Sequence, residues 1–560
     1  MAGISGATLE RSRVGGRSVL AAHGFPFSHG LAAGVCAMFP LSFGGNRMTF
    51  NSRFSRRAAL VTLLFSFLCF AQKDPGVRGG PPGAGGPIQG LTINELALFN
   101  EGRARTVQLE SVCDTCNDVA LGADTGEDPN LATLTNSSGL GSRFNGDQCS
   151  VCHQQPAIGG SGGFLVPNPQ DGPSHFRKPE NPMFDLIPHR KGAQNYVPSF
   201  ITQYGPIREV RFQRKPDGTP DGGVHQLFTV VGRSDSGSPG CTAAELPQPD
   251  FETQFRKRNL SFRIPLQTFG LGLIEAIQDM AILSNSASTA SLRQPLGIGG
   301  MPNRSGNDGT ITRFGWKAQN KSVTVFAGEA YNVEMGVTND VFPTSTDETP
   351  DCAHGKNEPN DITRVDTDDL RNQGFNNPLH ILPDWLEFAI FMRQLAPPQP
   401  VPFSASAQHG QQLFGTGVAN PGIGCFLCHT PMMVTGPGHE TQALQNVQAN
   451  LYSDLLIHHM GSGLADNISQ GLAQGDMFRT TPLWGVGQRI FFLHDGRTSD
   501  LLAAIQAHAS IPGQDDQGDS DAQGNRGNNY PPSEATAVIR KFNAMSSSDK
   551  QAILDFLRSL

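Results

Sequence analysis

Two sets of residues in this chain share a spacing that is suited to chemistry. Each set is a C-x-x-C-H motif, and the residues are Cys149, Cys152 and His153 in the first and Cys425, Cys428 and His429 in the second. This motif is the attachment signature of c-type haem, in which each thiol adds to a vinyl group and the adjacent imidazole binds the iron. Two copies therefore predict two covalently bound haem c groups, each with a histidine as an iron ligand.

The alternatives for each motif are a redox-active dithiol and one half of a zinc site. A structural zinc site needs further ligands, commonly a second C-x-x-C, and neither motif has a convincing one nearby. Haem is therefore favoured over zinc at both positions.

Four other cysteines lie outside the haem motifs and outside the N-terminal leader: Cys113, Cys116, Cys241 and Cys352. An even number in an exported protein indicates disulfides, for example one within each successive pair, but the sequence leaves the connectivity open. Asn117 follows Cys113 and Cys116, so this C-x-x-C pair is not a third haem site. A thiol-redox role for the pair is an alternative.

The N-terminal region has the pattern of a secretion signal. An arginine-rich segment at 53–57 precedes an apolar run at 58–71, which predicts a signal peptide that is cleaved after Ala71. Because Met48 lies just upstream, we expect residues 1–47 to be an over-called start. A retained single-helix anchor is the alternative, but the run is short for a membrane span. We therefore expect a periplasmic or exported protein with no stable membrane span.

The elements that must position the motifs divide the rest of the chain into three parts. Residues 72–90 are rich in Gly and Pro and predict a disordered linker. Residues 91–396 are predicted to be an N-terminal cytochrome c-like haem domain, with strand-like pieces within 206–260 as a long loop and β insertion. A Pro-rich joint precedes residues 401–560, the predicted C-terminal cytochrome c-like haem domain. The predicted fold class is therefore mainly α.

The final segment of the chain has the pattern of an amphipathic helix. Ser546 is predicted to cap its start, and Ile553, Leu557 and Leu560 recur at helical spacing on one face. We expect that face to be buried.

Charge limits the classes of partner. The chain of 560 residues carries a net charge of −8, and its first 71 residues, with seven Arg and one Glu, carry +6, which leaves −14 for the remainder. A mature chain this acidic argues against nucleic acid and anionic membranes as partners. It suits a small basic or neutral electron-carrier protein, or a small-molecule reductant.

The segments that follow the two motifs repeat in the same order. Residues 262–272 follow the first motif and residues 478–487 follow the second, and both contain an arginine, a Pro-Leu pair and a glycine-rich turn. The segments 313–317 and 492–497 come next in the two halves. A duplicated haem domain explains this order.

These segments carry a resemblance to a known family. The second half resembles the bacterial di-haem cytochrome c peroxidase superfamily, in which an H-D-G-R segment follows an Arg…Pro-Leu segment. The whole region from Leu96 to Leu560 more closely resembles the di-haem oxidoreductases, also called thiol oxidoreductases, within that superfamily. The runs that carry this resemblance are residues 143–145, 155–160, 270–277, 313–318, 334–338, 452–461 and 494–497.

The resemblance implies a distal ligand for the second haem. In the superfamily this ligand, usually Met, lies about fourteen residues after the histidine of H-D-G-R. In this chain His494 begins that segment and His508 stands fourteen residues later, so a His/His iron of lower potential is implied. Met460 is the main rival. His458 and His459 are expected at the haem edge or behind the ligands.

The resemblance also implies catalytic residues near the first haem. Trp316 falls where the superfamily has a tryptophan between its haems, with a plain core aromatic as the alternative. Glu334 resembles the distal acid–base glutamate, and Glu275 is a weaker second carboxylate. Phe326 occupies the neighbourhood of the superfamily's partner glutamine, which makes ordinary peroxidase efficiency doubtful.

The first iron could be capped by a histidine, as in resting peroxidases. The next histidines after the motif are His175 and His189, and an open iron is favoured over either ligand.

The predicted function is therefore an oxidoreductase. The C-terminal haem would store and relay electrons to a peroxidase-like N-terminal haem that reacts with peroxide or oxygen. A non-enzymatic periplasmic electron-transfer cytochrome is the main alternative, and thiol oxidation through Cys113 and Cys116 is the third class.

Overall fold

The computed structural model describes residues 72–108, 140–141, 143–162, 164–167, 176–181, 183, 196–229, 248–344, 346, 360–363, 382–510 and 530–560. These residues all belong to one unit, Phe70–Leu560. The predicted leader, the cysteines other than the motif cysteines, and His175 and His189 lie outside the described residues.

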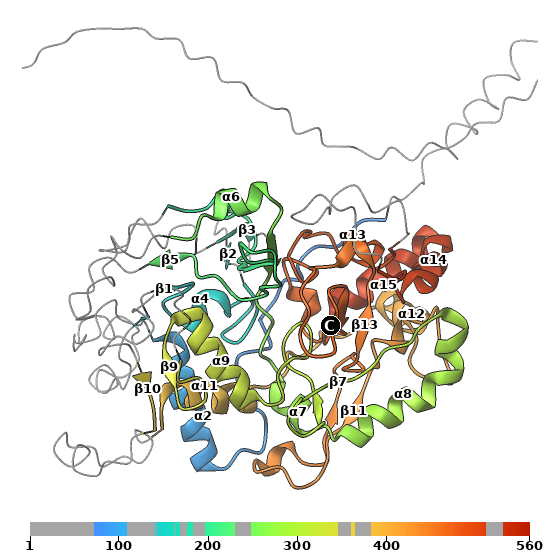
Figure 1. The fold of residues 1–560 in the computed structure, drawn as a ribbon. Coiled ribbons are helices and arrows are strands. Elements are labelled where there is room, and N and C mark those ends of the chain that lie inside the picture. Colours follow the sequence, from blue (N-terminus) through green and yellow to red (C-terminus); the bar gives the residue numbers. More distant parts are fainter. Residues whose placement is uncertain are drawn as a thin grey trace, which may run out of the picture. The chain divides into compact units, whose positions relative to one another are not determined.

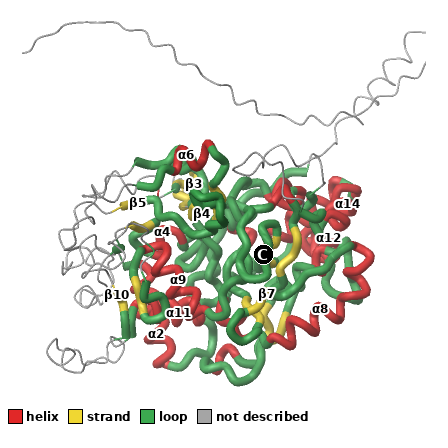
Figure 2. Tube along the Cα trace, viewed as in Figure 1, coloured by secondary structure: helices red, strands yellow, loops and turns green. Residues whose placement is uncertain are grey.

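Helices are the main regular elements, and long loops connect them (Figure 2). The helices in the described part of the chain are α2 (Ile93–Val107), α4 (Cys149–Cys152), α6 (Phe251–Arg256), α7 (Leu271–Ala276), α8 (Asp279–Arg293), α9 (Val323–Met335), α11 (Asp384–Gln394), α12 (Ala405–Phe414), α13 (Leu501–Gln506), α14 (Thr536–Ala544) and α15 (Ser547–Ser559).

The strands are short and pair in twos. Within the described residues the antiparallel pairs are β1 (Arg143–Phe144) with β5 (Phe228–Thr229), β2 (Phe164–Pro167) with β3 (Phe176–Glu180), β4 (Glu209–Phe212) with β6 (Leu260–Arg263), β7 (Asn303–Arg304) with β8 (Ile311–Thr312), β11 (Met433–Val434) with β12 (Gln448–Ala449), and β13 (Ile457–His459) with β14 (Met477–Arg479). The pair β9 (Thr338–Asn339) and β10 (Asn360–Asp361) is parallel. The fold is thus mixed with helices predominant, and β4 and β5 confirm the strand-like pieces.

Helices α2, α9 and α11 pack together beside the first haem motif (Figure 1). Helix α2 begins with a capping box, in which Thr92 accepts from the Glu95 amide and the Glu95 carboxylate accepts from the Thr92 amide. Gly102 lets α2 approach α11 closely, because a Cβ there would lie 2.3 Å from the carbonyl oxygen of Glu387. Small side chains at such crossings allow the helix axes to come together.

Helices α12 and α15 form the corresponding pair beside the second motif. Ser546 accepts a hydrogen bond from the Asp549 amide and caps α15, as the sequence predicts. The predicted face of Ile553, Leu557 and Leu560 is buried. This face joins a core with several phenylalanines, which include Phe414, Phe426, Phe542 and Phe556.

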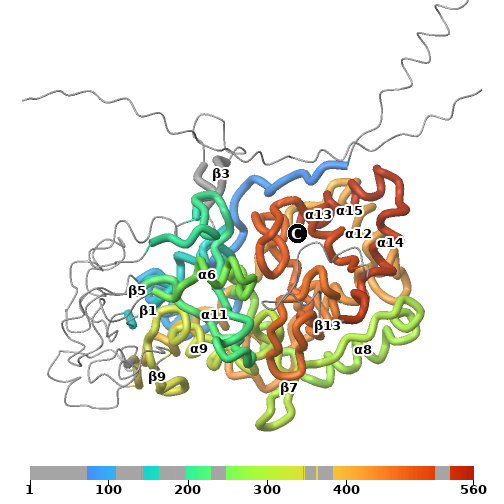
Figure 3. The backbone as a smooth tube through the Cα atoms, turned by 45° about the horizontal axis from the view of Figure 1, so that its top comes forward, coloured from blue at the N-terminus to red at the C-terminus, as the bar shows by residue number. Residues whose placement is uncertain are grey.

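Residues 72–90 pass as an extended strap over the unit (blue in Figure 3). The Asp74 carboxylate binds the Arg558 guanidinium through two hydrogen bonds, at 2.7 and 2.5 Å. The Arg78 amide donates to the Gly487 carbonyl, and the Ile88 amide donates to the Gln394 carbonyl. The expectation of a disordered linker is therefore wrong for these residues, because backbone and side-chain hydrogen bonds hold a segment that lacks regular structure.

In the part of the chain that the structure describes, no helix is both long enough and apolar enough to cross a membrane.

Candidate functional site

Each haem motif lines its own cavity. A cavity of about 180 Å³ contains Cys149, Cys152 and His153 in its wall. A second cavity, of about 230 Å³, contains Cys425, Cys428 and His429. Cys152, Cys425 and Cys428 are free thiols in the structure, and most of each wall is apolar. Both cavities therefore offer two thiols, an imidazole and an apolar surround, which is the donor set that a covalent haem needs.

Short helical turns present the motif residues. In the first motif, α4 places Cys149 and Cys152 one turn apart, and the His153 amide closes the turn onto the Cys149 carbonyl at 3.1 Å. In the second motif a 3-10 turn, Cys425–Leu427, does the same, and the His429 amide donates to the Cys425 carbonyl at 2.9 Å. Each turn directs its two thiols and its imidazole into the cavity of its own motif.

Backbone carbonyls orient the three candidate iron-binding imidazoles. The Nδ1 atoms of His153, His429 and His508 lie 3.1, 3.0 and 2.8 Å from carbonyl oxygens of other residues. A carbonyl only accepts, so Nδ1 carries the proton in each case and the lone pair is on Nε2. A lone pair on Nε2 with Nδ1–H held by a carbonyl is the arrangement of a histidine that binds a metal.

Burial keeps these imidazoles neutral, as iron binding requires. Burial lowers the pKa of His153 and that of His508. It also lowers the pKa of His429 to about 4, with a further contribution from the charge of His508. His429 and His508 are thus electrostatic neighbours in addition to lining the same cavity.

The structure brings His508 to the second cavity from the turn that follows α13. Met460, its rival as distal ligand, lines the same cavity. Both ring nitrogens of His458 already have carboxylate partners, because its Nε2 lies 3.0 Å from Asp454 and its Nδ1 lies 2.6 Å from Glu534. Its Nδ1 also lies 3.8 Å from the Cys428 sulfur, which puts His458 at the expected haem edge.

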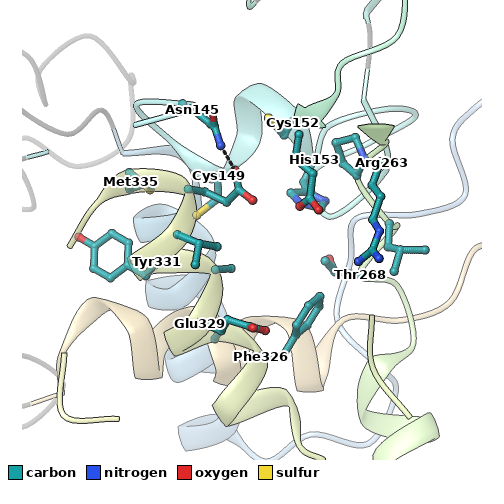
Figure 4. Close-up of a pocket in the computed structure, with 18 of the residues that line it drawn as sticks. Asn145, Cys149, Cys152, His153, Arg263, Thr268, Phe326, Glu329, Tyr331 and Met335 are labelled. Atoms are coloured by element: carbon teal, nitrogen blue, oxygen red, sulfur yellow. Dashed lines mark hydrogen bonds between the residues drawn. The ribbon is translucent and has the colours of Figure 1, made fainter. Parts of the chain in front are cut away.

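Glu334 lies in the wall of the first cavity. The Asn145 side-chain amide donates to its carboxylate at 2.7 Å, as the dashed line in Figure 4 shows. Burial and then the negative charge of Glu209 raise the pKa of Glu334 to about 8. Glu334 therefore holds a proton at neutral pH.

Glu209, a residue that the sequence analysis missed, forms a carboxyl pair with Glu334. The two side chains share a hydrogen bond in the same cavity wall. Arg211, on the same face of β4, binds Glu209 at 2.5 Å. Burial would raise the pKa of Glu209, but Arg211 and Arg263 lower it below its usual range. The pair therefore shares one proton, with Glu209 as the ionised member.

The only signal for Glu209 in the sequence is the alternation Glu-Val-Arg-Phe in the predicted strand, which puts Glu209 and Arg211 on one face.

The opposite wall of the first cavity comes from α9. In the view of Figure 4, Phe326 and Glu329 lie across the cavity from the two cysteines and His153. The Asn320 side chain donates a hydrogen bond to the Glu329 carboxylate. Among the described lining residues, His153 is the one histidine of this cavity.

Trp316 lines both cavities and is the residue that they share in the wall between them. Its indole nitrogen donates to the Ile264 carbonyl at 2.9 Å, and His494 meets its ring edge-on with centroids 6.4 Å apart. The sequence places it between the haems by resemblance, and the structure places it between the two motif cavities.

The structure does not place Glu275 in the described wall of either cavity. Arg393 binds its carboxylate at 2.6 Å, and the Val323 amide donates to it at 2.9 Å. Burial would raise the pKa of Glu275, but hydrogen bonds from His439 and Arg393 lower it to about 2. Glu275 is therefore an ionised structural partner of α9 and α11 in the described structure, which does not support the expected catalytic role.

Comparison with known proteins bears on the second motif and the wall between the cavities. Residues 250–517 match the family described as "Di-haem oxidoreductase, putative peroxidase". The matched segment includes Trp316, Glu334, the second haem motif and His508, and it begins after the first motif. No curated protein matches the chain.

A solved structure with similarity to the chain is hydrazine synthase from Kuenenia stuttgartiensis, at 17% sequence identity. The match covers 34% of this chain and 60% of that one, which is less than two thirds of its length. Its TM-score of 0.17 establishes no common fold. The family match does not depend on this likeness, and it shows that residues 250–517 of the chain are similar to the di-haem oxidoreductase family.

Proposed function

We propose that the protein is an exported di-haem c-type oxidoreductase in which the C-terminal haem relays electrons to a peroxidase-like N-terminal haem. The observation that carries the proposal is the position of Trp316 in the wall of both motif cavities. One cavity has a pair of neutral histidines, and the other has a proton-sharing carboxyl pair. The two cavities thus differ in the chemistry that their walls support.

Both haems are proposed to be covalent. Cys149 and Cys152 would hold one group and Cys425 and Cys428 the other, and His153 and His429 would each bind an iron. A bound haem supplies an iron that accepts and donates single electrons.

In the second cavity, His429 and His508 are the two histidines that would hold the iron of a bound haem. Their Nδ1–H groups are held by the carbonyls of Tyr452 and Ala504, so each ring is fixed in one tautomer. Two protein ligands leave no position for a substrate, which suits electron relay rather than catalysis. A small electron-carrier protein or small-molecule reductant would be the donor.

In the first cavity, the Glu209–Glu334 pair is proposed to move protons. The ionised Glu209 can accept a proton from one peroxide oxygen, while the protonated Glu334 can donate one to the other oxygen. Reduction of hydrogen peroxide to two waters consumes two electrons and two protons, so a site with a resident proton beside an electron route fits this reaction. Oxygen is the other candidate oxidant.

The test follows peroxide-driven reoxidation of the fully reduced protein by stopped-flow absorbance, with the two haems resolved by their spectra. Wild type should reoxidise both haems, and Trp316→Phe should slow reoxidation of the second haem more than that of the first. Glu334→Gln should slow both, because the proton donor is lost.

The non-enzymatic alternative predicts no reaction with peroxide or oxygen and no high-spin ferric band. Thiol oxidation predicts that Cys113→Ser or Cys116→Ser changes turnover. Either result would overturn the peroxidase-like assignment.

A further inference from the structure

Two buried arginines lie against the wall that separates the cavities. Arg479 and Arg489 both line the second cavity. The Arg479 amide donates to the Trp316 carbonyl at 2.8 Å, and its guanidinium donates to the Gly315 carbonyl at 3.1 Å. The Arg489 guanidinium lies over the Trp316 ring, 5.7 Å from its centroid. Two positive charges therefore face a mostly apolar cavity from the side of Trp316.

Arg489 has no counter-charge among the described residues. Its Nε donates to the Phe491 carbonyl at 3.0 Å, but its buried Nη2 has no hydrogen-bond partner there. Burial alone accounts for a pKa lowered to about 10, with no acidic neighbour to raise it. Arg263 is also buried, but it is paired with Asp466 at 2.7 Å. A buried guanidinium without an anion is costly, so the lone charge of Arg489 points to an anion that the described residues do not supply.

The acidic side chain in the described cavity wall, Glu534, already has hydrogen-bond partners. Glu534 lies 2.6 Å from His458 Nδ1 and accepts from the backbone amides of Gly299 and His459. It is therefore not a free partner for either arginine. The other polar side chains of the described wall are an amide, hydroxyls, thiols and imidazoles, and none of these is a carboxylate that could neutralise a cation.

We propose that Arg489 is the anion-binding residue of the second cavity and that its ligand is a propionate carboxylate of the haem held by Cys425 and Cys428. A planar guanidinium with free donors matches a carboxylate in a fork geometry. A haem carries two propionates, and this wall presents two guanidiniums, with Arg479 the companion charge. The inference rests on the second haem of the proposed function and adds a residue that positions its carboxylate and sets its potential.

The charge of Arg489 has a consequence for electron transfer. A cation beside the macrocycle favours the iron state of lower positive charge, so it raises the reduction potential. It also keeps the propionate ionised, so that the potential does not vary with pH near neutrality. Without Arg489 the potential should fall, and it should gain a pH dependence as the propionate takes up a proton.

The experiment compares the holoprotein with Arg489→Gln, Arg489→Lys and a matched control, Arg540→Gln. Arg540 is an exposed arginine on α14, a helix whose other face lines the same cavity. Pyridine haemochrome assay first counts haem per chain. Spectroelectrochemistry from pH 5 to 8 then gives the potential of the second haem, and resonance Raman spectroscopy gives the bending band of its propionates.

We expect Arg489→Gln to lower the potential, to make it pH-dependent and to shift the propionate band. Arg489→Lys should leave the potential close to that of wild type, because the positive charge remains. It should still shift the propionate band, because the paired hydrogen bonds of a guanidinium are lost. Arg540→Gln should match wild type.

Three results would overturn the inference. The first is a potential and propionate band in both Arg489 variants equal to those of wild type. The second is a wild-type potential that responds to added acetate or phosphate while Arg489→Gln does not, which would mean a free anion. The third is absence of haem at the second motif in wild type, which would also remove the proposed relay. If the second haem is present and the Arg489 variants behave like wild type, this inference fails but the proposed electron relay is unaffected.

Discussion

At the scale of single residues, His508 is the proposed determinant of the redox character of the second cavity. Its Nδ1 is held by the Ala504 carbonyl, and the imidazole is an electrostatic neighbour of His429. Imidazole is a harder donor than a thioether and favours the ferric state. The choice between His508 and Met460 therefore determines whether this haem is a low- or a high-potential carrier.

His508→Met should raise the potential of the second haem, and His508→Ala should convert that haem from low to high spin. The expected rise is on the order of 100 mV, a fraction of the ~0.8 V range that axial ligands cover. Redox titration measures the first change and EPR the second, with the first haem's signals as the internal control. A low-spin signal that survives in His508→Ala would identify another ligand, and Met460 would be tested next.

Glu209→Gln should change the pH profile of peroxide reduction. The charge of Glu209 helps to raise the pKa of Glu334 to about 8, so the protonated donor is present below that pH and lost as the pH rises through it. Removal of the charge lowers the pKa of Glu334, and the alkaline fall in rate should move to lower pH. The measurement is the initial rate of peroxide consumption from pH 6 to 9.

The control for this prediction is Glu440→Gln, a change at an exposed glutamate. An alkaline limb that stays in place in Glu209→Gln would show that Glu209 does not set the pKa of the proton donor. Arg211→Met gives a second check, because loss of its positive charge should raise the pKa of Glu209 and weaken its role as acceptor.

At the scale of elements, the α12–α15 pair supports the second cavity. Phe414 of α12 and Ile553 and Leu557 of α15 line that cavity. The two helices touch at Gly410, where a Cβ would lie 1.9 Å from the carbonyl oxygen of Ala552. The close crossing positions these apolar side chains around the second motif.

Gly410→Ala should separate these helices and destabilise the protein by about 1–3 kcal/mol, the usual cost of overpacking. Thermal unfolding followed at the second haem's absorption band measures the change. Gly306→Ala is the matched control, because a Cβ there meets nothing within 4 Å. An unchanged midpoint in Gly410→Ala would contradict the close packing of α12 on α15.

At the scale of the whole described unit, the strap at 72–90 ties distant segments together. The Asp74–Arg558 pair joins residues 484 positions apart, and the Leu501 amide also donates to Asp74 at 2.8 Å. Burial would raise the pKa of Asp74, but the hydrogen bonds from Arg558 and Leu501 lower it. The ionised carboxylate is therefore the form that stabilises the fold.

Asp74→Asn should lower the free energy of unfolding at pH 7 by about 1.5–3 kcal/mol, the range for hydrogen bonds to charged groups. A depressed carboxyl pKa contributes stability above the unfolded value of about 4 and loses it as pH falls through the folded value. The difference between wild type and variant should therefore shrink below pH 4. Thermal unfolding at pH 7 and pH 3.5 measures it, with Glu440→Gln at an exposed carboxylate as control. An equal difference at both pH values would exclude the ion pair as the cause.

Sequence reasoning succeeded where the determining contacts are local. The C-x-x-C-H motifs occupy five consecutive residues each, so one helical turn brings thiols and imidazole together whatever surrounds it. The cap at Ser546 and the buried face of α15 follow in the same way from the geometry of a single helix. His508 lines the second cavity at the spacing from His494 that the family resemblance implies, and its role as an iron ligand stays a prediction.

Tertiary structure alone decided which distant side chains meet. Asn145 and Glu334 are 189 residues apart, and Glu275 and Arg393 are 118 apart. The contact with Asn145 holds the Glu334 carboxylate in the wall of the first cavity. The contact with Arg393 holds the Glu275 carboxylate outside the described walls of both cavities. Such pairings depend on the packing of whole elements, which no spacing along the chain encodes. The same reason hid the Glu209–Glu334 pair, the unpaired charge of Arg489 over Trp316, and the strap, whose partners become neighbours only after the chain has folded.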